Sequence, residues 1–423
     1  MAKNLKKRKF LSIVSLLVFA LLLSASGAFA AENVLKLGVL FPLTGPCATA
    51  GQRCVAAVET AAEVINNKHP ELDVPLAKKE GILNGMKVQL VVADTQGKPD
   101  VAKSEAERLV NQEGVYAIIG SYNSSASKPA SAVTERAKKL FMCGCSSSAA
   151  LTERDFKYFF RLAPTDKTES KEFVEYIEWL NKNQKAGIKT IGLIYENTEF
   201  GKHAADEGKA AAKAAGFEVV ADVAFNPGAT NLNSEVQTLK AKNPDAVFGA
   251  CLGGDYTLWV RTMKQMNWLP KVALNYCTGY QDPKIAQQLG SDGNFFMGGT
   301  GYSPEIGAKY MKKVAAVEKI YSQKVGVPFD SDSIQEAVAL FILAQAIEKA
   351  GTLDVEKVAQ VLRTTTFDSP LSLGGKVAFG PGGQNMKATS IITQLHDGKY
   401  MPVYPKGYAE IKATVPMTPW DKR

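Results

Sequence analysis

The chain has 423 residues, of which 46% are hydrophobic and 22% are charged, and its formal net charge at neutral pH is +8. Five basic residues and no acidic ones lie in the first 30 positions, so the rest of the chain carries only +3. Because its charges are scattered, with no lysine- and arginine-rich block among aromatic residues, we expect no nucleic-acid partner.

The first 30 residues have the organisation of a secretory signal peptide. Basic residues precede an apolar run at 10–23, and small residues then lead to the sequence Ala28-Phe29-Ala30. This order is typical of export with cleavage after Ala30, and the apolar run is too short to span a bilayer comfortably. No cysteine follows the run to accept a lipid. We therefore expect a soluble mature protein in the periplasm.

All six cysteines lie in the exported part of the chain. An oxidising compartment favours disulfide bonds, and the spacings suggest the local pairs 47/54, 143/145 and 251/277. Cys143 and Cys145 lie near the limit of the Cα separation that a disulfide accepts, so more distant partners for each are the alternative. A Cys-x-Cys metal site is the alternative. Only three histidines occur, and none is close to this motif in sequence, so we expect no metal.

From residue 34 the chain alternates short β-branched runs with amphipathic stretches, which is the βαβ rhythm of a parallel sheet. The strand-like runs are 34–41, 86–94, 115–120 and 140–144, with helix-like runs at 50–67, 101–112 and 125–139. A second series of the same kind covers 171–184, 189–196, 201–216, 217–225, 232–243, 245–252, 255–266 and 271–276. The chain closes with helical patterns at 304–323, 331–350 and 354–363, then strands joined by glycine turns at 374–383 and 388–405.

The 393 residues of the mature chain exceed one ordinary hydrophobic core. We therefore predict an α/β fold of two doubly wound parallel-sheet lobes with a ligand cleft at the carboxyl ends of their strands. The expected N-terminal lobe comprises residues 31–163 and 299–370. The expected C-terminal lobe comprises residues 164–298 and 371–423.

The stretch GSYNSSASKPAS, residues 120–131, places five serines between a buried strand and a helix. Helix N-termini present unpaired N–H groups and a positive dipole end, so hydroxyls there can help to hold an anion. Simple N-capping by serine explains the same residues without any ligand. The stretch alone leaves both interpretations open.

Seven motifs, taken together and in order, resemble the branched-chain amino-acid binding family of periplasmic solute receptors, whose type I fold has a three-crossing hinge and serves ABC importers. They are LKLGVLFPLTGPCATAGQ, GSYNSSASKPAS, MCGCSSSAALT, FFRLAPTD, ENTEFG, NPDAVF and GKVAFGPGG.

The resemblance implies roles for particular residues. The hydroxyl and main chain of Ser124 would grip a ligand carboxylate, together with Ser147 and main-chain groups of Cys145. Phe200 matches an aromatic residue that closes over the ligand. Leu252 and Ala50 fall where family members often have tyrosine and an aromatic residue, so both departures imply a roomier or less polar wall.

The resemblance fails at the end of the strand KVALNY. Amino-acid binders tend to place an acidic residue there to hold the ligand ammonium, whereas this chain has Asn275, Tyr276, Cys277 and Thr278. Tyr276 is therefore the candidate wall residue. Asp255 and Asp282, in neighbouring loops, are the candidates to replace the missing acid, although positions on the solvated surface also explain them. An aromatic or aliphatic carboxylic acid or amide without an amine remains an alternative ligand, because an uncompensated buried ammonium is costly.

The resemblance implies a monomeric binding subunit without cofactor, which delivers a small amino acid or carboxylate to an inner-membrane ABC permease. We expect no enzyme, since no histidine accompanies Cys143 or Cys145 in a cleft motif to activate a nucleophile. A soluble ligand-sensing receptor subunit shares the fold and is an alternative, as, more remotely, is an exported hydrolase.

Overall fold

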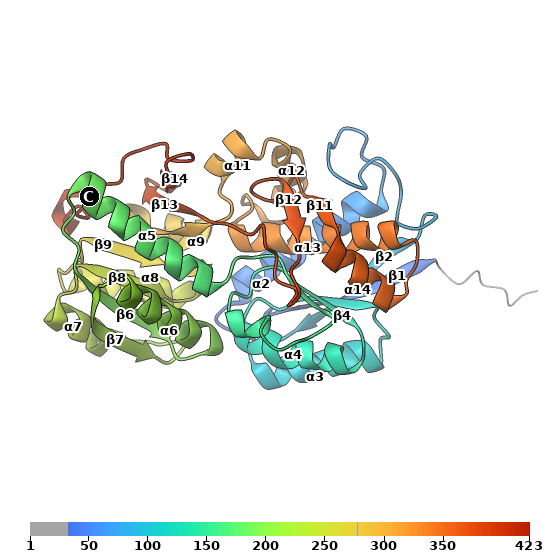
Figure 1. Ribbon diagram of the computed structural model, residues 1–423, viewed down its shortest axis with the longest axis horizontal. Helices are drawn as coiled ribbons and strands as arrows, with labels where there is room; N and C mark the ends of the chain where they lie inside the picture. Colours follow the sequence, from blue (N-terminus) through green and yellow to red (C-terminus); the bar gives the residue numbers. More distant parts are fainter. Residues whose placement is uncertain (1–32, 277) are drawn as a thin grey trace, which may run out of the picture.

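The computed structural model describes residues 33–276 and 278–423, so the predicted signal peptide and Cys277 lie outside the described residues. Two α/β lobes lie side by side (Figure 1). One lobe contains the N-terminal part of the chain in blue together with orange segments from its later part. The other contains the green and yellow segments and the red C-terminal strands. The predicted two-lobed α/β fold class is confirmed.

Five parallel strands form the sheet of the first lobe in the order β2-β1-β3-β4-β5. Alternate side chains enter separate apolar clusters, as Leu37 and Leu40 do, because helices cover both faces. The strands are β1 (Val34–Phe41), β2 (Lys87–Asp94), β3 (Ala117–Gly120), β4 (Leu140–Cys143) and β5 (Phe159–Arg161). The helices are α2 (Ala48–Asn66), α3 (Pro99–Asn111), α4 (Ser124–Arg136), α12 (Val314–Val325), α13 (Ser331–Ala350) and α14 (Val355–Thr364).

The second lobe has a seven-stranded sheet in the order β14-β13-β10-β9-β8-β6-β7, in which only β13 runs antiparallel to the other strands. The strands are β6 (Thr190–Glu196), β7 (Glu218–Phe225), β8 (Ala246–Ala250), β9 (Val272–Asn275), β10 (Met297–Thr300), β13 (Ile391–His396) and β14 (Lys399–Tyr404). The helices of this part are α5 (Asp166–Gln184), α6 (Glu199–Ala214), α7 (Asn233–Lys242), α8 (Gly253–Gln265), α9 (Thr278–Gln281) and α10 (Pro283–Leu289). A short helix after β10, α11 (Pro304–Tyr310), contacts both α12 and β14.

Three passages connect the two sheets. The first leaves β5 and enters α5, and the second follows β10. The third runs between β12 (Lys376–Ala378) and β13, because β12 still pairs with β11 (Thr366–Asp368) in a separate hairpin. The boundary expected after residue 370 falls between the two strands of this hairpin. Asn385 in the third passage donates a hydrogen bond to the Leu162 carbonyl in the first, at 3.0 Å, so these two passages run side by side.

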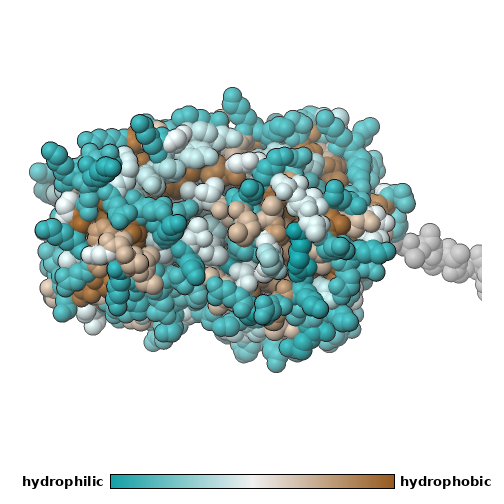
Figure 2. All heavy atoms as spheres, viewed as in Figure 1, coloured by the Kyte–Doolittle hydropathy of each residue, from teal (hydrophilic) through white to brown (hydrophobic). Residues whose placement is uncertain are grey.

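The structure divides the single helix expected at 304–323 into α11 and α12. Tyr310 ends α11 with its ring against Tyr408, 4.8 Å between centroids, and the chain turns there before α12 begins. No proline or glycine marks this break. Hydrophilic side chains dominate the face shown in Figure 2. Within the described ranges no helix is long and apolar enough to cross a membrane.

Candidate functional site

The candidate residues lie where strands of the two lobes end. Those of the first lobe follow or flank β1, β3 and β4, and those of the second follow β6, β8 and β9. Every one is buried, with exposed fractions of 8% or less. They are Ala50, Ser124, Cys145, Ser147, Phe200, Leu252 and Tyr276.

Polar contacts join the lobes around this region. Lys128 of α4 forms an ion pair with Glu199 of α6 at 2.9 Å, and the Ser148 hydroxyl donates to the same carboxylate at 3.4 Å. On another part of the interface, Arg53 of α2 binds Asp282, which precedes α10, with Nη1 and Oδ1 2.8 Å apart. All of these contacts connect residues more than 50 positions apart and hold the closed arrangement.

The serines that follow β3 and β4 fall into two groups. Ser127 accepts the Ser121 N–H and shares a hydrogen bond with Ser146, and Ser146 donates to the Tyr122 carbonyl. These hydroxyls are therefore occupied within the protein. The Ser147 hydroxyl makes no hydrogen bond with the described residues, which leaves it available to a ligand.

The start of α4 has no side-chain cap. Its N-cap is Asn123, whose side chain makes no capping bond, and the N–H groups of Ser124 and Ser125 find no acceptor in the described structure. Ser124 instead accepts the N–H of Ser148 through its hydroxyl at 3.3 Å, which ties the two serine loops together. The capping interpretation thus does not explain Ser124. The free N–H groups at this helix N-terminus suit an anion.

Asp166 is a candidate that sequence reasoning missed. Its N–H donates to the Ser147 carbonyl at 3.0 Å, and its Oδ1 accepts from the Ala149 N–H at 3.2 Å and from His203 Nδ1 at 3.0 Å. The other carboxylate oxygen, Oδ2, is fully buried without a hydrogen-bond partner. Bonding to Asp166 is also the main reason why the pKa of His203 is raised. The quoted motif FFRLAPTD contains this residue, but nothing in its pattern marked the acid.

The candidate residues of the second lobe lie in three different local settings. Phe200 lies in the first turn of α6, and Leu252 is the N-cap of α8. Tyr276 turns away into the core, since its hydroxyl bonds Ser170 Oγ at 2.7 Å and its ring packs 4.9 Å from that of Phe173. The N–H of Tyr276 donates to the Gly249 carbonyl at 3.0 Å, so neither this N–H nor the side chain is available to a ligand.

The two acids considered as ammonium partners already have partners of their own. Asp255 accepts the Gly228 N–H at 2.8 Å. Asp282 binds Arg53 and also caps α10 by accepting the Lys284 N–H at 2.9 Å. Both are buried rather than solvated surface acids. Asp282 is therefore already neutralised by Arg53, whereas Asp255 has no cationic partner among the described residues.

The expected cysteine pairs 47/54 and 143/145 are wrong in this structure, where all five described cysteines are free thiols. Seven helical residues rise by about 10 Å, so Cys54 in α2 is too far from Cys47 at its N-cap. The sulfur atoms of Cys143 and Cys145 lie in different apolar clusters. The third pair cannot be placed, because Cys277 lies outside the described residues.

Burial makes these thiols poor nucleophiles, because it raises the pKa of Cys54 and Cys143 to about 11 each. No group of three or more metal-ligating residues is placed to hold an ion anywhere in 33–276 or 278–423.

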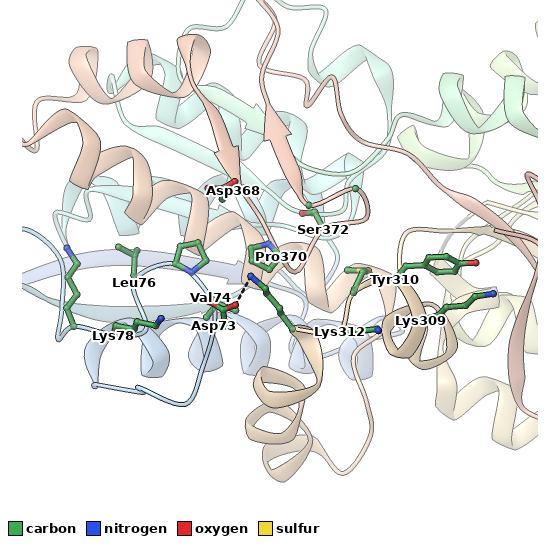
Figure 3. Close-up of a pocket in the computed structure, with 16 residues that line it drawn as sticks. Asp73, Val74, Leu76, Lys78, Lys309, Tyr310, Lys312, Asp368, Pro370 and Ser372 are labelled. Atoms are coloured by element: carbon green, nitrogen blue, oxygen red, sulfur yellow. Dashed lines mark ion pairs between the residues drawn. The ribbon is translucent and has the colours of Figure 1, made fainter. Parts of the chain in front are cut away.

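A large cavity lies away from the candidate residues. It measures about 1030 Å³ and lies on the first lobe between the 73–79 loop, the 309–313 junction and the 368–375 loop (Figure 3). Lys309 and Lys312 line one side, opposite Asp73 and Lys78. None of the seven candidate residues lines this cavity. A smaller cavity of about 210 Å³ lies between the lobes and is lined by Ala50 together with residues of both lobes.

Comparisons with known proteins find similarity along most of the chain. Residues 34–399 match the model of a family described as periplasmic binding protein. The chain is 27% identical over 400 residues to a Leu/Ile/Val-binding protein homolog 8 of Brucella suis, covering 92% of this chain and 95% of that protein. It is 25% identical over 414 residues to homolog 7 of the same organism, covering 96% and 99%.

Solved structures share the fold. A leucine binding protein LivK from Thermotoga maritima has a TM-score of 0.74 at 20% identity, over 86% of this chain and 97% of that one. A solute binding protein of an ABC transporter from Rhodopseudomonas palustris, in complex with 3,4-dihydroxy benzoic acid, also has a TM-score of 0.74. Its identity is 18%, over 93% and 100% of the two chains.

Proposed function

We propose, because the chain belongs to the periplasmic binding protein family, that it captures an α-amino acid between its two lobes and presents it to an ABC permease. The ligand carboxylate would lie against the N-terminus of α4, the Ser147 hydroxyl and the main chain at Cys145. Its ammonium would face Asp166. Binding in an interlobe cleft and hinge closure around the ligand suit a two-lobed receptor.

The observation that carries this proposal is the meeting of opposite polar groups at Ser147. Its hydroxyl and the free N–H groups of α4 are donors, which suit a carboxylate. Asp166, whose N–H bonds the Ser147 carbonyl and whose Oδ1 pairs with His203, keeps its second oxygen, Oδ2, buried without a partner, which suits an ammonium. Asp166 therefore supplies the acid that the end of β9 lacks.

Four probes separate the contributions of the two ligand groups. L-leucine and L-glutamate carry an ammonium, whereas 4-methylpentanoate and glutarate resemble them without it. Calorimetric titration of the wild-type protein with each probe tests the carboxylate grip, which all four share. Failure of all four to bind would contradict the proposed function.

Removing the hydroxyl of Ser124 or Ser147 is expected to weaken binding of the tightest probe by about ten- to 150-fold. This range corresponds to about 1.5 to 3 kcal/mol for a hydrogen bond to a charged group. Ser127→Ala is the matched control, because that hydroxyl is bonded to Ser121 and Ser146 instead. Unchanged affinity in both Ser124→Ala and Ser147→Ala, measured by the same titration, would exclude the grip.

Asp166→Asn is expected to weaken L-leucine and L-glutamate by about ten- to 100-fold, since it removes the negative charge that faces their ammonium. The amide oxygen can still accept from Ala149, so the loop should keep its shape. The amine-free probes 4-methylpentanoate and glutarate provide the internal comparison. An equal loss for probes with and without the ammonium would show that Asp166 acts only on the fold.

A further inference from the structure

The cavity of about 210 Å³ between the lobes adjoins the expected carboxylate grip. Ala50 and Tyr122 line its first-lobe side, and Ser124 begins α4 two residues after Tyr122. Its second-lobe side is formed largely by the beginnings of α8 and α10. A ligand held at α4 would therefore extend its distal end toward two helix N-termini.

The N-terminus of α8 is open to this cavity. The helix has 13 residues, and its N-cap Leu252 can provide no side-chain acceptor. The N–H groups of Gly253 and Gly254 make no hydrogen bond within the described residues. A Cβ at Gly254 would meet no atom within 4 Å, so the backbone there is open to a ligand. Free N–H groups at the positive end of a helix favour an anion.

Thr257 supplies an independent indication. It lies one turn further along α8, lines the same cavity and is only 7% exposed. Its Oγ1 is buried and has no hydrogen-bond partner. Native proteins rarely leave a buried hydroxyl unpaired, because the lost hydration is not recovered. A ligand group in the cavity would satisfy it.

Lys284 brings a positive charge to the same cavity. It lies in the first turn of α10, where the helix dipole disfavours a cation. It has no ion pair within the described part of the chain, because the nearby Asp282 carboxylate is taken by Arg53. An unpaired lysine at an unfavourable helix position is explained if an anionic partner joins it.

We propose that the N-terminus of α8, the Thr257 hydroxyl and Lys284 form a second anion-accepting subsite, which binds a distal acidic group of the ligand. This subsite rests on the proposed function, and it assigns the ligand to the acidic amino acids. Three acids lie close to the subsite: Asp282 lines the cavity and is paired with Arg53, and Glu196 and Asp255 lie nearby. Burial raises the pKa of Glu196 to about 7 and also raises that of Asp255, which lessens their repulsion of an anion.

The four probes test the subsite separately from the carboxylate grip. L-glutamate should bind at least about tenfold more tightly than L-leucine, and glutarate more tightly than 4-methylpentanoate. Binding of the two monocarboxylates that equals or exceeds that of their dicarboxylate counterparts would overturn the subsite and leave the proposed function standing. No binding by any probe would overturn both.

Substitutions test whether Lys284 and Thr257 form the subsite. Lys284→Met and Thr257→Val keep the side-chain size and should each lower the ratio of L-glutamate to L-leucine affinity by about tenfold. Lys324→Met is the matched control, since Lys324 is already paired with Glu63 at 2.8 Å. It should leave the ratio unchanged. An equal loss for both probes in the Lys284 and Thr257 variants would show a general effect on closure and overturn the assignment.

Discussion

Replacing Arg53 with methionine is expected to lower the free energy of unfolding by about 3 to 5 kcal/mol, the usual cost of removing one partner from a buried ion pair. Arg53 is 4% exposed and reaches two carboxylates, Asp282 Oδ1 and Asp330 Oδ2, each at 2.8 Å. Methionine would leave both buried acids without a counter-charge. Urea denaturation at neutral pH measures the loss.

Two further variants distinguish the effect of Arg53 on the stability of the first lobe from its effect on the closed form. Asp282→Asn removes only the second-lobe partner and leaves Arg53 with Asp330, so we expect a smaller loss of stability but weaker holding of the closed form. Lys128→Met breaks the half-exposed pair with Glu199, which should cost no more than about 1 kcal/mol. An Arg53→Met protein as stable as Lys128→Met would contradict the importance of the buried cluster.

The fold was predictable because its signals are local and repeated. Alternating apolar runs and amphipathic stretches, such as 34–41 followed by 50–67, correspond to β1 and α2 with shifts of a few residues. Parallel strands buried on both faces must be nearly all apolar, which makes them easy to recognise. The end of the third passage was harder, because the β11–β12 hairpin and β13 share the same glycine-linked strand pattern.

The candidate site was predictable only in part. The stretch that follows β3 was recognisable as a candidate because of its many hydroxyls. The sequence alone could not distinguish Ser127, whose hydroxyl is bonded to its neighbours, from Ser147, whose hydroxyl is not. The direction of Tyr276 depends on Ser170 and Phe173, which lie about 100 residues away. Asp166 looked like an ordinary residue of a crossing segment. Long-range contacts decide all three cases, and periodicity contains no information about them.

The cysteine prediction failed because it relied on compartment and spacing alone. Cys145 lies under the cleft and contacts Glu336, a residue 191 positions later in the chain. Glu336 is fully buried in α13, and its Oε1 lies 3.1 Å from Cys145 Sγ. Its Oε2 accepts the Gly144 N–H at 3.2 Å. A Cβ at residue 144 would lie 2.3 Å from the Glu336 side chain, which explains why glycine is found there.

This contact gives the protein a proton-dependent stability. Burial raises the pKa of Glu336 to about 8 from 4.5, and the hydrogen bonds from Cys145 and Gly144 offset only part of that rise. Between these values the unfolded chain has released the proton and the folded chain has kept it. The folded state therefore binds more protons, and the contribution of Glu336 to stability falls as pH rises from about 4.5 to about 8.

Glu336→Gln should remove this dependence. Glutamine imitates the protonated acid, since its amide oxygen can accept from Gly144 and its amide N–H can donate to the Cys145 sulfur. We expect the variant to match the wild type near pH 4.5 and to exceed its free energy of unfolding by on the order of 3 kcal/mol at pH 7. Urea denaturation across this range, with the exposed Glu153→Gln as control, measures the difference. A constant gap between Glu336→Gln and wild type from pH 4.5 to 8 would show that the carboxyl ionises in the folded protein as it does in the unfolded chain.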